Sequence, residues 1–531
     1  MRLSLLLLLL LPLSLGYKYA IFVPNIANSQ VQFCARVAEV LANGGHDVTM
    51  IHISLLSDFK TDVKIPKGVK VQEVQAFAEG ITKQQIETEQ SELIFDEMSF
   101  FDRRFFAMMA RFSSLQQEGC RKILRNKVFM DWLKNEKFDV AYAYIYSTCP
   151  IGLIHTAKIP SWVWLNSGPM LDFVAQTIGV PTIPSYVPPV VMAASDDMSF
   201  YERTKSVIGH SLTGLFAKYL VAAKDTQVFR EELNDPTFPE TLEIAAKCPL
   251  VIVNTNELYD LPRPLLAKVV NIGGLGVGFE NAKPLTGEFK TITETGKGTI
   301  IFSFGSVAAA DKMPLKWKNA LLTAFAEFPD YQFVMRYVAD DIKDRLPKNV
   351  HIFKWLPQKD ILLHNNTKAF ITHGGYNSMQ EAISAGVPLV TIALFGDQPK
   401  NAKVAKKHGF AVNIEKGTLS KETIVAALED VLGSDGYRQK AQRLSQMVRM
   451  QPMKPSERLL RWSEFLAEFK TLENLEPAGQ KLNFIQYFSL DVLAALATVL
   501  LLVVYGIYRI LKAIVCCVCG RRRNYEKVKT N

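Results

Sequence analysis

The feature that most constrains the fold is a repeated alternation of apolar runs with amphipathic segments. Residues 17–23 have the continuous apolar character of a buried strand, and residues 31–43 carry apolar side chains at helical spacing. Gly44 and Gly45 end that helix, and residues 46–53 form a second apolar run. A strand, a helix and a strand with short connections predict a βαβ unit, and therefore a parallel sheet.

The same alternation returns in the second half of the chain. Strand-like runs occupy residues 298–304, 331–337, 351–355, 369–373 and 388–393, and helical patterns cover residues 314–328, 358–364 and 376–385. A Gly-rich stretch near residues 270–295 marks the boundary between the halves. We therefore expect an α/β fold in which two Rossmann-like domains face a cleft. Ligands of such sheets bind at the carboxyl ends of the strands.

The length of 531 residues also favours two domains, because one hydrophobic core rarely supports a chain of this size. Residues 1–16 contain one arginine, an apolar run and small residues at the end, which is typical of a cleaved signal peptide. The alternative is an uncleaved N-terminal anchor. We place the N-terminal domain at residues 17–280 and the C-terminal domain at residues 281–470.

A second apolar segment, residues 488–508, is long enough to cross a bilayer. Residues 509–531 follow with seven basic side chains and one acidic side chain, so the tail carries +6 of the net charge of +9. The positive-inside rule places this tail in the cytosol and the two domains in the lumen. The remaining body is close to neutral, which argues against a nucleic-acid-binding surface.

Lys527 and Lys529 lie five and three residues from the C-terminus, as in the dilysine signal that returns proteins to the endoplasmic reticulum. The alternative is a basic tail that binds anionic lipid headgroups. Four cysteines precede the apolar segment, Cys34, Cys120, Cys149 and Cys248. They can pair in three ways or remain buried thiols. No Cys and His spacing indicates a metal site.

Residues 355–398 contain the side chains that suggest a chemistry. A strand ends at His373-Gly374-Gly375, and a helix begins at once. Glycines let a ligand approach the backbone, and the free N–H groups and positive dipole end of a helix suit a phosphate. Glu381 lies one turn beyond Asn377, where a carboxylate could accept hydrogen bonds from a ribose hydroxyl pair.

Two further features of this stretch suit a nucleotide sugar. Trp355 offers a flat surface for a base, and Asp397 with Gln398 provides the acceptors and donors that sugar hydroxyls need. Each feature alone has an ordinary structural explanation: a tryptophan is more often in the core, and a lone histidine is more often structural. The order and spacing of these residues together, more than any one of them, indicate a nucleotide-sugar site.

That order resembles the signature of the UDP-glycosyltransferases, most closely in its animal UDP-glucuronosyltransferase form. The shared pattern is W-x-x-Q, then THGG-x-N, a Glu four residues after the Asn, and DQ. Length, N-terminal signal, C-terminal anchor and dilysine tail agree with that family. The resemblance implies a GT-B fold, a UDP-glucuronate or UDP-glucose donor, a small lipophilic acceptor, and inversion at the anomeric carbon. It implies no metal ion and no cofactor.

The resemblance also implies a role for each matching residue. These are uracil stacking by Trp355, contact with uracil or ribose by Gln358, diphosphate binding by Ser306, Thr372, His373, Gly375, Asn377 and Ser378, ribose binding by Glu381, and sugar binding by Asp397 and Gln398.

The chain departs from the family where the general base is expected. The family has a histidine sixteen residues before the His46 position, and Gln30 stands there. The family's orienting aspartate is matched by Tyr144, which has an ordinary pKa of about 10. A neutral amide cannot accept the proton. Tyr144, His155 or Asp172 could serve instead, or Gln30 could orient the acceptor by hydrogen bonds.

We therefore expect an active hexosyltransferase of the endoplasmic reticulum membrane, with glucuronosyl transfer favoured over glucosyl transfer. The alternative is a UDP-sugar-binding relative that is catalytically weak or inactive and acts as a partner protein. A third class, a lumenal membrane protein unrelated to sugar donors, would make the pattern accidental. The family often self-associates, so homo-oligomers and hetero-oligomers are both open.

Overall fold

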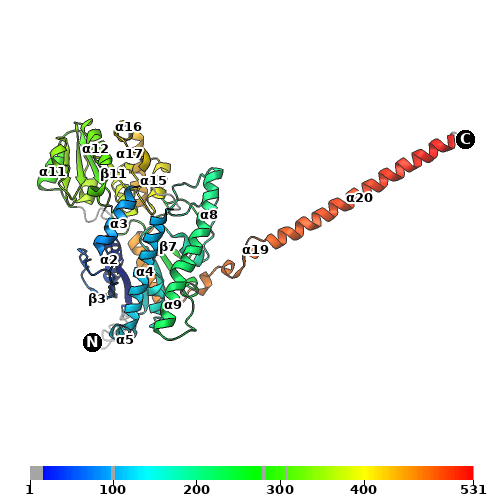
Figure 1. The fold of residues 1–531 in the computed structure, drawn as a ribbon, viewed down its shortest axis with the longest axis horizontal. Helices are drawn as coiled ribbons and strands as arrows, with labels where there is room; N and C mark the ends of the chain where they lie inside the picture. Colours follow the sequence, from blue (N-terminus) through cyan, green and yellow to red (C-terminus); the bar gives the residue numbers. More distant parts are fainter. Residues whose placement is uncertain (1–15, 97–101, 278–282, 306–307, 530–531) are drawn as a thin grey trace, which may run out of the picture. The chain divides into compact units, whose positions relative to one another are not determined.

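The structure of the chain is a computed structural model that describes residues 16–96, 102–277, 283–305 and 308–529 (Figure 1). The expected signal peptide, except Gly16, lies outside the described residues, as does Ser306. The chain divides into two compact units, Met1–Leu475 and Glu476–Asn531. The first unit contains two parallel sheets, and we call the parts built on them the first and the second lobe.

The first lobe is built on a seven-stranded sheet in the order β3-β2-β1-β4-β5-β6-β7. Its strands are β1 (Lys18–Asn25), β2 (Asp47–Ser54), β3 (Val69–Gln75), β4 (Val140–Tyr144), β5 (Trp162–Asn166), β6 (Leu250–Val253) and β7 (Val269–Asn271). Every pairing is parallel. The central strands are almost fully buried because helices cover both faces, which explains their continuous apolar runs.

The helices of this lobe are α2 (Asn28–Asn43), α3 (Lys83–Phe95), α4 (Arg103–Arg125), α5 (Lys127–Asn135), α6 (Cys149–Thr156), α7 (Asp172–Thr177), α8 (Phe200–Phe216), a π-helical stretch (Ala217–Ala222), α9 (Ala223–Glu232) and α10 (Thr241–Ala246). A disulfide joins Cys120 on α4 to Cys149 on α6, whereas Cys34 and Cys248 are buried thiols.

The second lobe is built on a six-stranded parallel sheet in the order β10-β9-β8-β11-β12-β13. Its strands are β8 (Gly298–Ser303), β9 (Tyr331–Arg336), β10 (Val350–Phe353), β11 (Thr367–Thr372), β12 (Leu389–Thr391) and β13 (Ala411–Asn413). Its helices are α11 (Gly287–Glu294), α12 (Leu315–Ala326), α13 (Gln358–Leu362), α14 (Tyr376–Ala385), α15 (Gln398–Lys407), α16 (Lys421–Gly433) and α17 (Asp435–Arg449). The expected α/β class with two Rossmann-like sheets is confirmed.

Helices pack across the division between the lobes in two places. The C-terminal end of α3 packs into the second lobe, where the Phe95 ring lies 5.7 Å from the Trp317 ring. In return α18 (Pro455–Phe469) packs on the first lobe, and its Ser463 hydroxyl hydrogen-bonds to Tyr142 of β4 at 2.5 Å. The chain therefore crosses between the lobes more than once.

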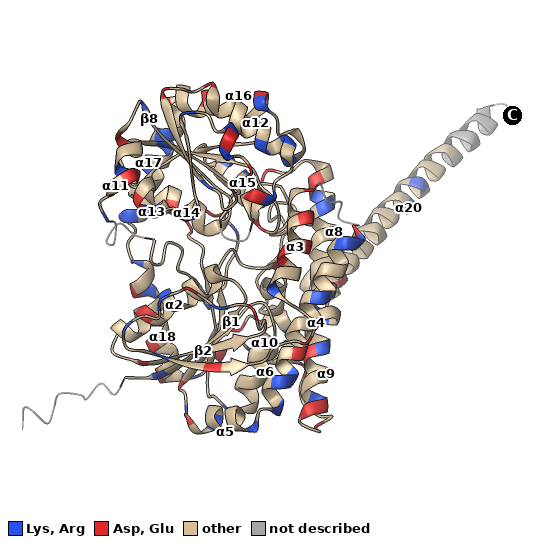
Figure 2. Cartoon of the chain, turned by 60° about the vertical axis from the view of Figure 1, so that its left-hand side comes forward, with Lys and Arg blue, Asp and Glu red and all other residues tan. Residues whose placement is uncertain are grey.

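The strand orders show where a ligand belongs. In each sheet the chain adds strands first toward one edge and then toward the other. This change of order falls between β1 and β4 in the first lobe and between β8 and β11 in the second. Loops at such a switch point diverge and leave room for a ligand. Gln30 follows β1, Tyr144 ends β4, and His373 follows β11. Figure 2 shows acidic and basic residues interspersed along the ribbon of both lobes.

The second unit contains α19 (Phe484–Tyr487) and the long helix α20 (Leu490–Lys529). Residues Leu490–Cys519 are long and apolar enough to cross a membrane, with a mean hydropathy of 2.4 in the most apolar window. The helix thus includes residues 490–508 of the apolar segment expected from the sequence and continues into the basic tail.

Candidate active site

The turn between β11 and α14 forms the base of the candidate site. Gly374 has a φ of +80°, a conformation that side-chain-bearing residues rarely adopt. A Cβ atom on Gly375 would lie 2.6 Å from His373 Nε2, so this position has no room for a side chain. Among the described residues, no side chain caps the N-terminus of α14. Its first N–H groups are therefore free to bind an anion.

His373 lies beneath this turn and is only 9% exposed. Burial lowers the pKa of His373 to about 4, because the charged imidazolium is penalised away from water. Its Nδ1 lies 3.3 Å from the Thr372 hydroxyl. At neutral pH the ring is therefore uncharged and can offer one hydrogen-bond donor and one acceptor.

Asn377, in the first turn of α14, is oriented from the first lobe. Asn254, which follows β6, donates from Nδ2 to Asn377 Oδ1 at 3.3 Å and to the Ser167 carbonyl at 2.9 Å. Gln380 donates in turn to the Asn254 carbonyl at 3.0 Å. Because the Asn377 oxygen is engaged by Asn254, its amide nitrogen is left as the group available to a ligand. Ser378 beside it is buried.

Gln358 and Glu381 form a pair at the start of α13 and along α14. Gln358 Nε2 donates to Glu381 Oε2 at 2.7 Å. Burial raises the pKa of Glu381, while the hydrogen bond from Gln358 and the charges of Arg36 and Lys359 oppose the rise. Arg36 comes from α2, and its guanidinium donates to the Leu275 carbonyl at 3.4 Å. The pair thus lies beside a cation from the first lobe.

Trp355 follows β10 and is 72% exposed, so its ring is open to a stacking partner and does not belong to the core. The Arg336 guanidinium lies 5.5 Å from the Trp355 ring centre and hydrogen-bonds to the Gly305 carbonyl. Arg336 therefore connects this flat ring with the loop after β8.

Asp397 and Gln398 open α15 in different ways. Gln398 is buried, and its Oε1 accepts from the backbone N–H groups of Leu394 and Phe395 at 2.9 and 3.1 Å. Asn401 Nδ2 donates both to Asp397 Oδ2 at 2.8 Å and to the Gly374 carbonyl at 3.0 Å. Burial raises the pKa of Asp397. Gln398 thus holds the loop between β12 and α15 in place. Asn401 links Asp397 to the glycine turn.

Gln30, at the position of the expected base, lies at the switch point of the first lobe's sheet. Gln30 is in the first turn of α2, and its Oε1 is buried without a hydrogen-bond partner among the described residues. The Tyr144 hydroxyl hydrogen-bonds to Ser167. The Tyr144 ring packs at 5.2 Å against Tyr146, whose hydroxyl also interacts with the Gln30 amide and with the charge of Asp397. Burial raises the pKa of both tyrosines.

The two other candidates for a base are engaged elsewhere. Asp172 is buried, accepts from the Val190 N–H at 2.9 Å and lies 3.5 Å from His210. His155 is exposed and packs edge-on against Phe238. No contact in the described part of the chain joins either of them to Gln30.

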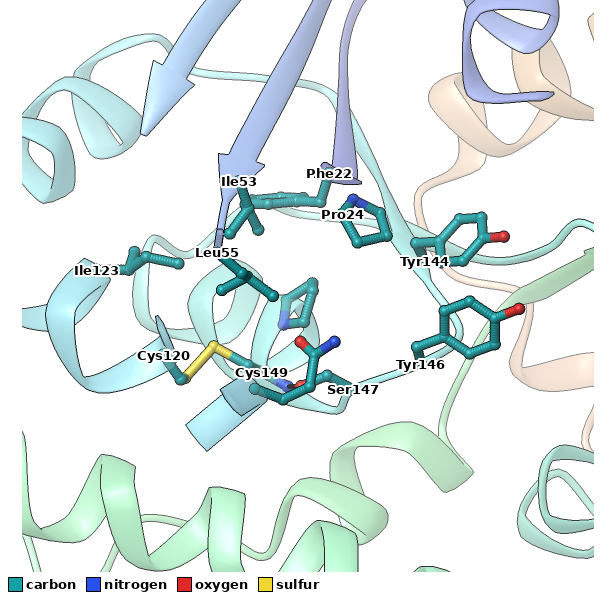
Figure 3. A pocket seen from close by; sticks show the side chains of 12 residues that line it. Phe22, Pro24, Ile53, Leu55, Cys120, Ile123, Tyr144, Tyr146, Ser147 and Cys149 are labelled. Atoms are coloured by element: carbon teal, nitrogen blue, oxygen red, sulfur yellow. Dashed lines mark hydrogen bonds between the residues drawn. A yellow bond between two sulfur atoms is a disulfide. The ribbon is translucent and has the colours of Figure 1, made fainter. Parts of the chain in front are cut away.

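A narrow apolar pocket lies beside Tyr146, at the carboxyl ends of β1, β2 and β4 (Figure 3). Its cavity measures about 20 Å³ and is lined by Phe22, Pro24, Ile53, Leu55, Gln116, Cys120, Ile123, Tyr144, Tyr146, Ser147, Cys149 and Pro150. The Cys120–Cys149 disulfide forms part of the wall. This volume holds little more than one water molecule, so a larger ligand requires side chains to move.

Comparison with known proteins agrees with this geometry. Residues 20–525 match the family model described as UDP-glucoronosyl and UDP-glucosyl transferase. The chain belongs to this family. It is 33% identical to UDP-glucuronosyltransferase 2B33 of Macaca mulatta, covering 88% of each chain. It is 31% identical to the putative UDP-glucuronosyltransferase ugt-50 of Caenorhabditis elegans, covering 91% of this chain and 92% of the relative.

Solved structures of other glycosyltransferases share the fold. A UDP-glucosyltransferase from Polygonum tinctorium, in a complex with 3,4-dichloroaniline, superposes with a TM-score of 0.58 at 16% identity. The alignment covers 85% of this chain and 99% of that chain. The expected GT-B architecture of the UDP-glycosyltransferase family is therefore confirmed.

Some residues of this UDP-glycosyltransferase site were not predicted from the sequence. Asn254 and Arg336 both stand at the carboxyl end of a strand, and Tyr146 follows β4 by two residues. The rule that ligands bind at these ends could have identified all three. Arg36 gave no such signal, because it lies in the middle of a helix. Among the described residues, no group of three or more His, Cys, Asp or Glu side chains could hold a metal ion.

Proposed function

We propose that this chain transfers a hexosyl group from a UDP-sugar to small lipophilic acceptors, with inversion and without a metal ion or cofactor. The supporting observation is the Gly374-Gly375 turn at the uncapped N-terminus of α14, beside a neutral His373. In the proposal the free N–H groups of α14 and the Asn377 amide bind the diphosphate, together with Thr372 and Ser378. Ser306 in the loop after β8 would join them.

The rest of the donor would extend along neighbouring loops. Uracil would stack on Trp355, and Gln358 with Glu381 would hold the ribose hydroxyls, since a carboxylate accepts two hydrogen bonds at once. Asp397 and Gln398 would bind the sugar. Glucuronosyl transfer is favoured because the similar curated proteins are named UDP-glucuronosyltransferases, and UDP-glucose is the other candidate donor.

The acceptor would enter beside Tyr146 and Gln30. Its nucleophilic atom attacks the anomeric carbon, and the bond to the UDP oxygen breaks with the electron pair leaving on UDP. No group at this position takes up a proton at neutral pH, because Gln30 is an amide and burial raises the pKa of Tyr144 and Tyr146. The acceptors are therefore acidic phenols, which attack as phenolates after losing the proton to water, or amines, which give up the proton to water once the new bond has formed. Gln30 orients them by hydrogen bonds.

A second function has one observation in its favour. Both members of the family's base dyad are replaced, by Gln30 and Tyr144, while the donor residues are intact. This pattern suits a protein that binds UDP-sugar and acts as a partner, as a homo-oligomer or hetero-oligomer, without efficient transfer. In either case we propose that α20 anchors the chain in the endoplasmic reticulum membrane with both lobes in the lumen.

The test is transfer by membranes that contain the full chain, with UDP-glucuronate and UDP-glucose supplied separately. The acceptor panel spans aromatic amines, acidic phenols and alcohols. We expect turnover with the first two classes and little with alcohols. Gln30→His should raise transfer to alcohols, because a positioned base contributes roughly 10²–10⁴-fold.

His373→Ala should abolish both transfer and UDP binding, and His351→Ala on β10 is the matched control. His351 is partly buried and hydrogen-bonds to Gln332, outside the site. Transfer by the wild type that persists in His373→Ala would refute the proposed donor site. UDP binding without transfer in the wild type, with transfer restored in Gln30→His, would establish the binding protein instead.

A further inference from the structure

Helix α3 is buried only in its last turn. Of its 13 residues, the buried ones are Leu93, Ile94 and Phe95. A helix that covers a sheet normally carries a stripe of apolar side chains along its whole length, and α3 has no such stripe. Covering the core of the first lobe therefore does not explain this helix. We call Ile94 and Phe95, which are buried in the second lobe's core, the α3 tip.

The start of α3 is held by the first lobe. The Asp58 carboxylate accepts from the backbone N–H groups of Lys83 and Gln84 at 2.8 and 3.3 Å, and these hydrogen bonds lower the pKa of Asp58. Thr82 and Gln85 form a capping box at the same end. Together these contacts pair N–H groups that have no partner within the helix. The helix is thus fixed to the first lobe at one end and buried in the second lobe at the other.

Phe95 packs behind the segment that follows β8. It is 6% exposed, and its ring centre lies 6.4 Å from that of Phe304. The Phe304 ring lies edge-on to His373 at 6.4 Å. A Cβ atom on Gly305 would lie 2.9 Å from His373 Cε1, so the backbone passes directly against the histidine there. Phe95 therefore supports, from the first lobe, the Phe304-Gly305 segment that contacts His373.

A lysine connects the α3 tip with the loop after β12. Lys416 Nζ donates to the Ile94 carbonyl at 3.0 Å and to the Leu394 carbonyl at 3.3 Å. Carbonyls in the last turn of a helix lack partners within it, and a cation there also meets the negative end of the helix dipole. The Leu394 N–H donates in turn to Gln398 Oε1 at 2.9 Å. The loop that leads to Asp397 is therefore joined to α3.

We propose that the α3 tip is a positioning element of the donor site. Phe95 holds the Phe304-Gly305 segment against His373, and the Ile94 carbonyl holds the loop before Asp397 through Lys416. Both residues act through segments that would contact the donor, and not by touching it. The inference rests on the proposed donor site and adds that the first lobe sets part of the donor affinity. The first contact acts on the diphosphate end and the second on the sugar end.

The first test is titration of UDP into the full chain in detergent. Phe95→Ala removes the ring behind Phe304 and should weaken UDP binding about tenfold, because a displacement of about 1 Å near a binding group is costly. Phe95→Leu fills most of the same space and should restore most of the affinity. Phe129→Ala is the matched control, since Phe129 on α5 is 4% exposed in the first lobe's core. It should lower the melting temperature as Phe95→Ala does and leave UDP affinity within about twofold.

The second test separates the sugar from the diphosphate. Lys416→Met keeps the aliphatic stem and removes the donor to Ile94 and Leu394. UDP alone should bind within about twofold of the wild type, whereas the UDP-sugar that the wild type binds, UDP-glucuronate or UDP-glucose, should bind about fivefold more weakly. Lys421→Met is the control, because Lys421 forms an exposed ion pair with Glu327. It should bind both ligands as the wild type does.

An unchanged Kd for UDP in Phe95→Ala, with a lowered melting temperature, would mean that the α3 tip only joins the lobes, and the proposal would be wrong. Equal weakening of UDP and UDP-sugar in Lys416→Met would overturn the role of the second contact. His373→Ala separates these results from a failure of the proposed function. UDP affinity retained in His373→Ala would remove the donor site itself, whereas affinity lost there but kept in Phe95→Ala would overturn this inference alone.

Discussion

Asn254 decides which way the Asn377 amide faces, and Asn254→Asp should reverse it. In the structure the Asn254 amide nitrogen donates to Asn377 Oδ1 at 3.3 Å. This leaves the Asn377 nitrogen for the proposed diphosphate. A carboxylate at position 254 can only accept, so Asn377 would turn its nitrogen toward the new carboxylate and its oxygen toward the ligand.

The expected loss follows from one hydrogen bond to a charged group. Such a bond contributes about 1.5–3 kcal/mol, which corresponds to a roughly 10- to 150-fold weaker Kd for UDP. The negative charge next to the diphosphate adds to this loss. Asn254→Asp also removes the donor to the Ser167 carbonyl, so a lower melting temperature will accompany the change.

Isothermal titration of UDP into the full chain in detergent measures the affinity. Asn256→Asp is the control, because Asn256 is equally buried on the same loop and donates to Gln451 Oε1 at 3.0 Å. It should lower stability to a similar degree and leave UDP affinity within about twofold. If Asn254→Asp binds UDP as the wild type does while Asn377→Ala does not, the argument that Asn254 orients Asn377 is refuted.

Three further changes test other parts of the structure. Gly375→Ala should abolish UDP binding in the same titration, because its Cβ would lie 2.6 Å from His373, whereas Gly433→Ala meets nothing within 4 Å and should bind normally. The pKa of His373 is about 4 in the fold and about 6.5 when unfolded, so the unfolded chain takes up the proton first. Stability should therefore fall by up to about 3 kcal/mol as pH drops from about 6.5 to about 4, and denaturant titrations of His373→Gln should lack this part of the fall. Cys120→Ser with Cys149→Ser should lower the free energy of unfolding by about 3–4 kcal/mol for a sequence separation of 29, and a reductant should destabilise the wild type but not this variant.

The periodic parts of the fold could be predicted because they depend on local pattern. The helix expected at residues 376–385 coincides with α14, and the expected parallel pairing of residues 17–23 with 46–53 is present as β1 and β2. Continuous apolar runs indicate strands buried in a sheet, and apolar side chains at helical spacing indicate helices packed on it. Both patterns can be recognised in the sequence alone. The glycine turn after β11 was likewise readable, because Gly374 needs a positive φ.

Contacts between segments that are distant in the sequence could not be predicted from the local pattern of residues. Residues 455–469 form the amphipathic helix α18, but nothing in their sequence indicates that this helix packs on the first lobe through Tyr142. The link between Asn254 and Asn377 joins residues 123 positions apart. Arg36 has no distinguishing local pattern, because its surroundings are created only when α2 meets the second lobe.

The return of α18 to the first lobe has a consequence for biosynthesis. Leu459, Leu466 and Ala467 are buried in the first lobe's core, yet about 190 residues separate them from the end of β7. Ribosomes add about 5–20 residues per second, so the first lobe waits roughly 10–40 s for its last helix. During that interval the groove for α18 is open on a nascent chain. The first lobe is therefore synthesised before the second lobe but completes its fold only after α18 has been made. A chaperone that shields this groove would act during that interval.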